Sequence, residues 1–337
     1  MASSALTGKK CLVTGGSGFV GSHLCLALLK LGADVTIVDR RFPENPYPLA
    51  NKAHQRLNVL IHDVSDLEYM KRLVNALKPD FVFHLAAQPL SVPSNLKPYE
   101  TKVDNIDTTY SVLEAIRTKS PAALIFSSTA CYYGLQHESP LNEESSPNVG
   151  EFMYTATKIA ADFAVRHYAS IYNLKMTCCR FVNLYGEGDV NASRIVPQTV
   201  AYLLQGKRPE LLRDDGQTVL DFMHVSDAVR ALIRSAEDID VAKGKAVNFG
   251  TGKPITVIDL VRMISRIYTD EYIEPLVLGS PREPTLRKYL SVERAQKLLK
   301  WKAEISLETG LKRTIEWYRQ NPSVLLGENL PKTSVPI

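Results

Sequence analysis

The sequence predicts an α/β fold in which a doubly wound parallel sheet carries a smaller C-terminal α/β domain. In the first half, short apolar runs alternate with segments whose apolar residues recur at helical spacing. This alternation is typical of strand–helix–strand units and of a parallel sheet. After about residue 185 it loosens into short helical segments joined by longer loops. We therefore expect one domain over residues 1–184, a second mostly over 185–330, and a tail at 331–337.

The expected elements follow from period and from turn residues. Strands are expected where short apolar runs meet glycine or polar residues, at 10–16, 34–40, 57–64, 81–87, 121–129 and 175–186. Helices are expected at 21–33, 67–80, 105–120 and 154–174, and then at 194–207, 256–268, 292–301 and 307–321. Gly32 is a plausible end for the first helix, and Pro79 stops the second.

Composition excludes several classes of protein. The chain has 337 residues, of which 45% are hydrophobic and 23% charged, and its formal net charge is +4. These values are ordinary for a globular protein, and the scattered basic excess does not indicate a nucleic-acid partner. The five cysteines form no C-x-x-C pair, so neither a disulfide framework nor a metal site is expected. Without a membrane-length apolar run or a signal peptide, we expect a cytoplasmic protein that does not bind membranes.

A glycine-rich loop follows the first expected strand. Gly15, Gly18 and Gly21 have the spacing G-x-x-G-x-x-G and lead into the first helix. Glycines at such a turn allow close backbone approach, so a pyrophosphate can lie on the helix N-terminus. The first domain is therefore expected to be a Rossmann-like domain that binds a dinucleotide.

Acidic residues at two strand ends bear on the identity of the dinucleotide. Asp39 ends the second strand, 18 residues after Gly21. A carboxylate there accepts hydrogen bonds from ribose hydroxyls and repels a 2′-phosphate, which favours NAD over NADP. The neighbouring Arg40 and Arg41 could instead hold that phosphate. Asp63, at the end of the third strand, is placed either to contact adenine or to cap its own loop.

A tyrosine and a lysine open the long helix after the fifth strand. Tyr154 and Lys158 are four residues apart and so lie on one helix face. A nearby ammonium is expected to stabilise the phenolate and lower the pKa of Tyr154 towards neutrality, which would make it a general base. Thr129 supplies a hydroxyl that can bond the same substrate oxygen.

At this point the sequence resembles the extended short-chain dehydrogenase/reductase family, in particular its nucleotide-sugar epimerases and dehydratases. The matching stretches are TGGSGFVGSHL, HLAAQ, SSTACYYG, YTATK, RFVNLYGEGD, RIVP, DFMHVSDAV, NFGTG and LSVERAQKLLKW, which run from about residue 9 to 318. The resemblance implies an enzyme in which Thr129, Tyr154 and Lys158 oxidise a sugar hydroxyl, usually at C4, while NAD takes the hydride. It also implies a homodimer that assembles through two helices of each subunit.

The resemblance further implies which residues contact cofactor and substrate. On the cofactor side these are Gly15, Gly18, Phe19, Val20, Gly21, Asp39, Arg40, Asp63, Val64, Leu85, Ala86, Ala87, Gln88, Tyr154 and Lys158. On the side of the nucleotide-diphosphate sugar they are Ser91, Thr129, Ala130, Asn183, Arg194, Val196 and Arg282. The family often has a diphosphate-binding arginine at position 220, where this sequence has Leu220. Arg282 or Arg194 is therefore expected to neutralise more of the diphosphate charge.

The residues after Thr129 separate the possible outcomes. Dehydratases and the related decarboxylase usually carry polar or acidic residues there, whereas this sequence has Ala130 and Cys131. Because alanine cannot transfer a proton, ordinary dehydration loses its usual acid. Cys131 is either a packing residue or an acid/base group, since thiols beside cations ionise more readily and a cysteine occupies this place in 3,5-type epimerases.

The sequence thus favours an NAD-dependent epimerase that inverts C4 through a transient 4-keto sugar. HLAAQPL and YGEGDVNASRIVP resemble CDP-glucose 4,6-dehydratase, so a dehydratase with altered acid/base residues is the alternative, as is a 3,5-type epimerase that uses Cys131. A non-catalytic NAD-binding regulator is the third hypothesis, and the intact Tyr–Lys pair argues against it.

Overall fold

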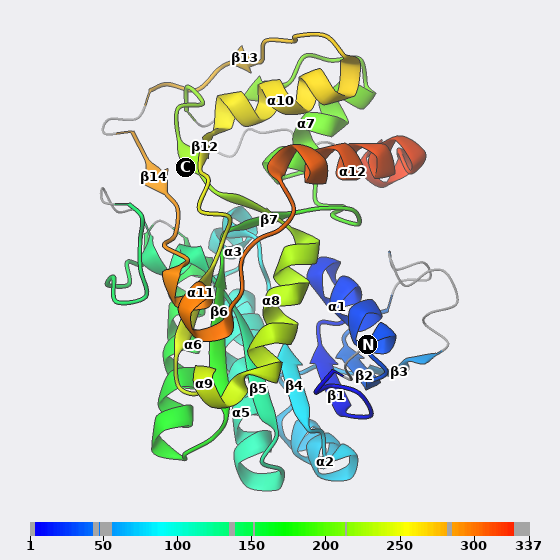
Figure 1. Cartoon of the computed structure of the whole chain (residues 1–337), viewed down its shortest axis with the longest axis vertical. Helices are drawn as coiled ribbons and strands as arrows, with labels where there is room; N and C mark the ends of the chain where they lie inside the picture. Colours follow the sequence, from blue (N-terminus) through cyan, green and yellow to red (C-terminus); the bar gives the residue numbers. More distant parts are fainter. Residues whose placement is uncertain are drawn as a thin grey trace.

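A computed structural model describes residues 4–42, 47, 56–134, 139–150, 152–212, 214–281 and 285–326. The tail at 331–337 and Arg282 therefore lie outside the described residues. The fold has two layers of helices around a central sheet, with a smaller unit above the carboxyl ends of the strands (Figure 1).

The central sheet has seven strands in the order β11-β6-β5-β4-β1-β2-β3. The strands are β1 (Lys10–Thr14), β2 (Asp34–Asp39), β3 (Asn58–Ile61), β4 (Phe81–His84), β5 (Ala123–Thr129), β6 (Met176–Phe181) and β11 (Ala246–Phe249). All pairs are parallel, which confirms the predicted doubly wound sheet. The strand order reverses between β1 and β4, and ligands of such sheets bind beyond the carboxyl ends at this point.

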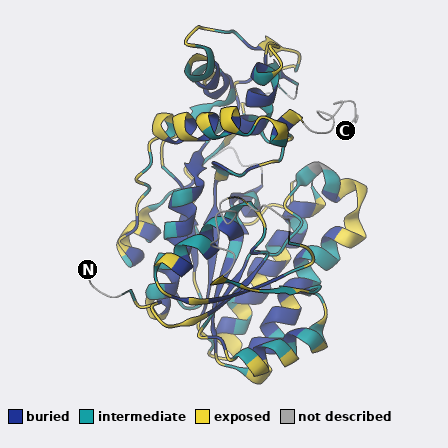
Figure 2. Ribbon diagram, turned by 90° about the vertical axis from the view of Figure 1, so that its right-hand side faces the viewer, coloured by how far each residue is buried: buried dark blue, intermediate teal, exposed yellow. Residues whose placement is uncertain are grey.

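Helices cover both faces of this sheet. One face carries α2 (Leu67–Leu77), α5 (Thr108–Lys119) and α6 (Met153–Ile171), and the other carries α1 (Phe19–Lys30), α8 (Val225–Glu237), α9 (Ile239–Ala242) and α11 (Glu293–Leu299). Most residues of the strands are buried, apart from those of the edge strand β3, whereas the helices expose their outer sides (Figure 2). Removal of this apolar surface from water is the main force that holds the layers together.

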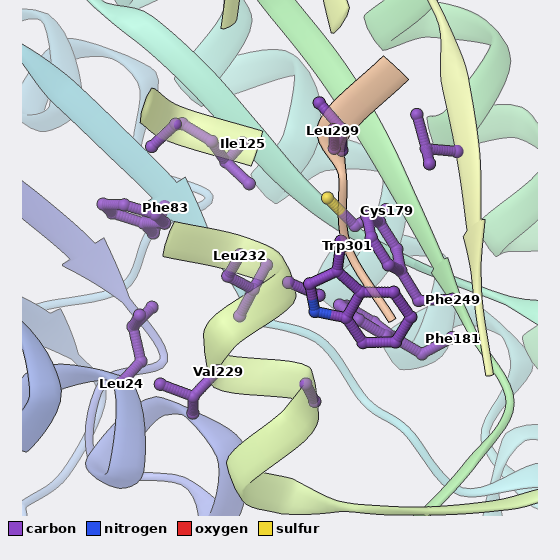
Figure 3. Close-up of a cluster of buried hydrophobic side chains, with 14 of the residues drawn as sticks. Leu24, Phe83, Ile125, Cys179, Phe181, Val229, Leu232, Phe249, Leu299 and Trp301 are labelled. Atoms are coloured by element: carbon purple, nitrogen blue, oxygen red, sulfur yellow. The ribbon is translucent and has the colours of Figure 1, made fainter. Parts of the chain in front are cut away.

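The largest core cluster joins the two ends of the chain. Leu24 of α1 and Leu232 of α8 pack with Phe83 of β4, while Trp301 packs edge-on against Phe249 of β11 at 4.9 Å between ring centroids (Figure 3). The seventh strand and three covering helices thus come from residues beyond 184. A single boundary at 184/185 was expected from the sequence. In the structure, the residues after 184 contribute both to the central sheet with its helices and to the smaller unit.

The smaller unit consists of short strands and helices. Its strands are β7 (Asn183–Tyr185), β8 (Glu210–Leu211), β9 (Val219–Leu220), β10 (Phe222–His224), β12 (Ile255–Thr256), β13 (Leu276–Val277) and β14 (Arg287–Lys288). They pair as β10-β7, β12-β9-β14 and β13-β8. The helices are α7 (Ile195–Leu204), α10 (Val257–Thr269), α12 (Leu307–Gln320) and α13 (Ser323–Leu326), and their apolar sides form a separate core.

Several elements differ from the sequence prediction. The segment before α5 forms α3 (Ser91–Leu96), α4 (Pro98–Lys102) and a π-helical turn, η2 (Val103–Asp107), where only one helix from 105 was expected. The sequence did not predict these helices because it contains Pro93 and Pro98, and proline usually marks the end of a helix. The strand expected at 175–186 is broken at Val182 into β6 and β7, which pair in different sheets. Helix α8 was not predicted.

Candidate active site

The glycine loop connects β1 to α1 as predicted. Gly15 has φ +69°, and a Cβ there would lie 2.7 Å from the backbone nitrogen of Ala86. Gly18 is the N-cap of α1, and no side chain caps that helix end. A helix N-terminus with uncapped amide groups is a suitable place for a pyrophosphate. The loop therefore fits the phosphates of a dinucleotide, and Phe19, Val20 and Gly21 form the first turn of α1.

Asp39 lies beside this loop at the end of β2. Its carboxylate accepts hydrogen bonds from the hydroxyl of Ser17 at 2.5 Å and from the backbone nitrogen of Arg40 at 2.8 Å. The side chain of Arg40 forms an ion pair with Asp104 at 2.9 Å. Because Asp104 already neutralises this guanidinium, Arg40 is poorly placed to hold a 2′-phosphate. The geometry therefore fits the ribose hydroxyls of NAD.

Asp63, in the loop after β3, makes contacts within its own loop. The carboxylate of Asp63 accepts hydrogen bonds of 2.8 Å from both the backbone nitrogen and the hydroxyl of Ser65. Val64 is buried, and its carbonyl accepts a hydrogen bond from Ser111. These contacts fit the loop-capping alternative for Asp63, and its contact with adenine stays a prediction.

The LAAQ segment after β4 is anchored from two sides. The backbone nitrogens of Leu85 and Ala86 bond to Thr14 at 3.1 and 3.2 Å, and the sequence runs on through Ala87. Asn105 accepts from the Gln88 backbone nitrogen at 2.7 Å and donates to the hydroxyl of Thr157 at 2.9 Å. This buried amide links the segment to α6.

Sequence reasoning missed Asn105. It lies in the π-helical turn η2, a distortion that is frequent at functional sites. An asparagine within a helical segment was the signal that could have identified it, because asparagine is unfavourable in helix interiors.

Thr129 and Tyr154 lie next to each other at the carboxyl edge of the sheet. Thr129 ends β5, and its hydroxyl accepts a hydrogen bond of 3.2 Å from the backbone nitrogen of Cys131. Tyr154 is in the first turn of α6, where the hydroxyl of Ser94 accepts a bond from its backbone nitrogen at 3.0 Å. The Thr129 hydroxyl is near enough to the phenol to act on its pKa, which it lowers. The two predicted hydroxyls therefore converge on one point.

Lys158 lies on the same helix as Tyr154, but its ammonium is directed at the strand. The nitrogen donates a hydrogen bond of 2.7 Å to the backbone oxygen of Ser127 and lies 4.3 Å from the ring centre of Phe126. Burial lowers the pKa of Lys158 to about 8, although the negative charge of Asp162 opposes this shift.

The expected lowering of the pKa of Tyr154 is not found in the protein alone. Burial raises the pKa of this phenol, and the electrostatic influence of the neighbouring Cys131 raises it further. The Thr129 hydroxyl and the charge of Arg194 oppose the increase without overcoming it. The prediction was wrong in this respect because burial of the phenol has the largest influence on its pKa. Bound NAD would add the positive charge of an oxidised nicotinamide ring, which favours the phenolate.

Cys131 lies in the short helix η3 (Ala130–Tyr133), directly after Thr129. It is half-buried, whereas the four other cysteines are buried. The ammonium of Lys288 in β14 lies 3.7 Å from its sulfur. Sequence reasoning missed Lys288, and nothing in the local sequence indicates that β14 reaches this point. Ala130 is buried and adds no polar group.

The other predicted substrate residues are dispersed. Ser91 opens α3, Asn183 is exposed at the start of β7, and Val196 is packed in the core of the smaller unit with 2% of its surface exposed. Arg194 ion-pairs with the buried Asp189 at 3.1 Å and lies 5.9 Å from the ring centre of Phe19. Of these four, Arg194 is the residue that the described contacts bring to Tyr154 and the glycine loop. The roles of the others stay predictions.

A buried ion pair supports the catalytic helix from behind. Asp162, one turn after Lys158, accepts hydrogen bonds from Arg180 of β6 at 2.7 and 3.0 Å and from the hydroxyl of Ser128 at 2.8 Å. The guanidinium of Arg180 also lies 3.4 Å from the ring centre of Tyr132. Tyr132 thus packs on this network, in keeping with its buried position. The network fixes α6 against β5 and β6.

Two further properties concern only the described part of the chain. No group of three or more His, Cys, Asp or Glu side chains in it could hold a metal ion. None of the helices described there is both long and apolar enough to cross a membrane.

This fold and site are those of a Rossmann-like enzyme with a glycine loop suited to a dinucleotide and a buried tyrosine at the carboxyl edge of the sheet. The chain belongs to the NAD dependent epimerase/dehydratase family, which it matches over residues 11–250. Its relatives include a UDP-glucose 4-epimerase of Corynebacterium glutamicum, 30% identical over 91% of this chain and 94% of the relative. Another is a UDP-N-acetyl-alpha-D-glucosaminuronate decarboxylase of Bacillus cytotoxicus, 31% identical over 93% and 98%.

Solved structures show the same fold. The UDP-glucose 4-epimerase of Thermotoga maritima, solved with UDP-glucose, superimposes with a TM-score of 0.83 at 29% identity, over 93% of this chain and 99% of that chain. These findings confirm the family and its cofactor, NAD. They also bear out an enzyme of the nucleotide-sugar epimerase, dehydratase and decarboxylase group.

Proposed function

We propose that this protein is an NAD-dependent nucleotide-sugar epimerase that inverts C4 through a transient 4-keto sugar. One observation carries the proposal: Thr129, Tyr154 and Lys158 are assembled at the sheet edge, while the two positions after Thr129 hold no carboxylate. Oxidation at C4 needs the three assembled groups. Elimination of water needs an additional acid and base, and Ala130 can be neither.

The residues of the chain have separate tasks in this reaction. When bound, NAD supplies a hydride acceptor and later returns the hydride. Tyr154 removes the proton of the sugar hydroxyl, and the electron pair of the O–H bond forms the carbonyl as the hydride leaves C4. Thr129 holds the same oxygen, and Lys158 adds positive charge beside the base. Inversion follows when the keto sugar turns and hydride returns to its opposite face.

The test uses sugars linked to UDP, GDP, CDP and dTDP, incubated with the purified protein in D₂O without added reductant. NMR is expected to show a C4-inverted sugar without solvent deuterium, because the same hydrogen leaves and returns as hydride. A 4-keto-6-deoxy product would contradict the proposal in favour of a dehydratase. Deuterium at C3 or C5 would favour the 3,5-type reaction with Cys131 as base, and tight NAD binding without turnover would favour a regulator.

We also infer a homodimer formed through α5 and α6. Several large apolar residues on these neighbouring helices are exposed, among them Tyr110, Phe163, Ile171 and Tyr172. Their burial against a second copy would remove this surface from water. Light scattering is expected to give twice the mass of the chain, and Ile171→Lys is expected to shift the protein towards monomer. A monomeric mass for the unmodified protein would contradict this inference.

A further inference from the structure

Lys288 places a positive charge in the wall of the catalytic site. Its nitrogen lies 3.7 Å from the sulfur of Cys131. Among the ion pairs of the described residues none involves Lys288, whereas Arg194, another cation of the site region, pairs with Asp189. A partly buried ammonium is stabilised by an anion, and a thiol does not supply one unless it is ionised.

Short contacts place the Lys288 ammonium near the hydroxyls of Thr129 and Tyr154. Cys131 bonds through its backbone nitrogen to the hydroxyl of Thr129 and lies close enough to affect the ionisation of Tyr154. Lys288 is therefore separated from the two hydroxyls by a single cysteine side chain. A sugar whose C4 oxygen meets Thr129 and Tyr154 must present an adjacent substituent to Lys288.

Among the described residues of the neighbouring wall, no carboxylate pairs with this charge. Ala130 and Cys131 are neutral in their ordinary forms, and Leu220 is the register partner of Lys288 between β9 and β14. A bound substrate can supply the anion that these described residues do not.

A nucleotide-linked hexuronic acid has two anionic groups, its diphosphate and its carboxylate, and the ring geometry distinguishes them. The diphosphate is attached at C1, which is opposite C4 across a pyranose ring. The exocyclic carbon C6 is attached at C5, directly beside C4, and it can be a carboxylate without loss of a ring hydroxyl. A cation next to the groups that bind the C4 oxygen is therefore nearer to C6 than to the diphosphate.

We propose that Lys288 binds a carboxylate at C6, so that the preferred substrate is a nucleotide-linked hexuronic acid. The proposal rests on the proposed function, because oxidation at C4 fixes which side of the sugar faces Cys131. Cys131 contributes by carrying a thiol where a carboxylate could stand. A carboxylate in its place would pair with Lys288 and occupy the charge that the substrate needs.

The experiment compares glucuronate and glucose linked to the same nucleoside diphosphate, taken as the one that binds best in the panel above. The kcat/KM ratio of glucuronate to glucose is expected to favour the acid in the unmodified protein. Lys288→Met is expected to lower this ratio about 10- to 100-fold, because this factor corresponds to the usual free-energy contribution of a hydrogen bond to a charged group. Lys288→Arg should retain most of the ratio, and Cys131→Glu should lower it as Lys288→Met does.

Arg287→Met is the matched control, because Arg287 is an exposed cation on the same strand. It is expected to leave the ratio unchanged. An equal loss for both sugars in Lys288→Met would overturn the proposal and indicate an acid/base or purely structural role. Weaker binding of the nucleoside diphosphate alone would overturn it in favour of a diphosphate contact.

Calorimetry with the NAD-bound protein separates this proposal from the proposed function. If neither sugar is converted but glucuronate binds more tightly and Lys288→Met removes the preference, the epimerase proposal fails and the Lys288 proposal stands. If both sugars are inverted at C4 without preference, the Lys288 proposal fails and the epimerase proposal stands.

Discussion

The ammonium of Lys158 donates a hydrogen bond of 2.7 Å to the backbone oxygen of Ser127. This bond joins α6, which carries Tyr154, to β5, which ends in Thr129 two residues after Ser127. Tyr154, the proposed base, is thus held near Lys158 and Thr129 by one short link between a helix and a strand. Such a link limits relative movement of the groups, which favours catalysis because it lowers the cost of orientation.

Loss of this link is expected to reduce sugar oxidation strongly. Lys158→Met keeps the aliphatic stem but removes the charge beside Tyr154, so we expect a decrease of about 10²- to 10⁴-fold, typical for the loss of an acid/base component. A single-turnover measurement of NADH absorbance with saturating substrate checks this. Lys175→Met, which removes an exposed lysine paired with Asp240, is the control and should oxidise at the normal rate. Normal oxidation by Lys158→Met would contradict the role given to Lys158.

Tyr154→Phe is expected to abolish oxidation while NAD still binds, because only the hydroxyl is removed. Burial raises the pKa of Tyr154, so the phenolate is the minor form near neutral pH. A general base acts in its deprotonated form, and the rate of oxidation should therefore rise from about pH 6 to about pH 9. Single-turnover rates across this range provide the measurement. A rate that falls with pH, or equal turnover in Tyr154→Phe, would mean that another group is the base.

The framework of this site could be predicted from sequence because its signals are local. The glycine loop, Asp39 and the Tyr154–Lys158 pair each follow from a spacing within one turn or one helix. Asn105 and Lys288 could not be located in this way, because their contacts bridge 17 or more residues and depend on tertiary packing. The pKa of Tyr154 was misjudged for the same reason, since burial is a property of the fold.

The seventh strand shows a related limit. β11 has the apolar residues of a buried strand, but its place beside β6 depends on the path of the chain through the smaller unit. Similarly, the break at Val182 cannot be read from an apolar run that continues through it. The spacing of apolar residues alone can show that a segment is extended. It does not show which sheet the segment joins.

The buried pair Asp162–Arg180 is expected to contribute strongly to stability when only one partner is removed. Asp162→Asn should lower the free energy of unfolding by about 3–5 kcal/mol, because the buried Arg180 keeps its charge without a carboxylate. Arg180→Leu should cost less, because Arg166 still pairs with Asp162 at 2.8 Å. The double variant should lose less than the sum of the single losses. Urea unfolding gives these values, and Asp240→Asn, an exposed partner in an ion pair, should change stability by about 0–1 kcal/mol. Strict additivity of the two losses would show that the pair is not coupled.

Acid should weaken the protein partly through Glu187. Burial opposes ionisation of this carboxyl, but the hydrogen bond from His224 and the charge of Arg313 outweigh it and lower the pKa of Glu187 to about 2. Since the folded pKa is below the ordinary value of 4.5, its contribution is complete above about pH 4.5 and is lost as the pH falls towards 2. Unfolding of the unmodified protein and Glu187→Gln should therefore show a stability gap that is constant above pH 5 and narrows below about pH 4.5. A gap that widens in acid would refute this assignment.

Thiol labelling should distinguish Cys131 from the four other cysteines. Burial raises the pKa of Cys11, Cys25, Cys178 and Cys179, to about 12 for Cys11 and Cys179, so these thiols are inaccessible and un-ionised. Cys131 is half-buried and faces the catalytic site. A thiol reagent should modify one cysteine in the native protein and all five after denaturation. Cys131→Ser should remove the native reaction, and saturating substrate should slow it because the sugar covers the sulfur. Rapid labelling of Cys131→Ser would show that another cysteine is accessible, and labelling unaffected by a bound nucleotide sugar would place Cys131 outside the sugar pocket.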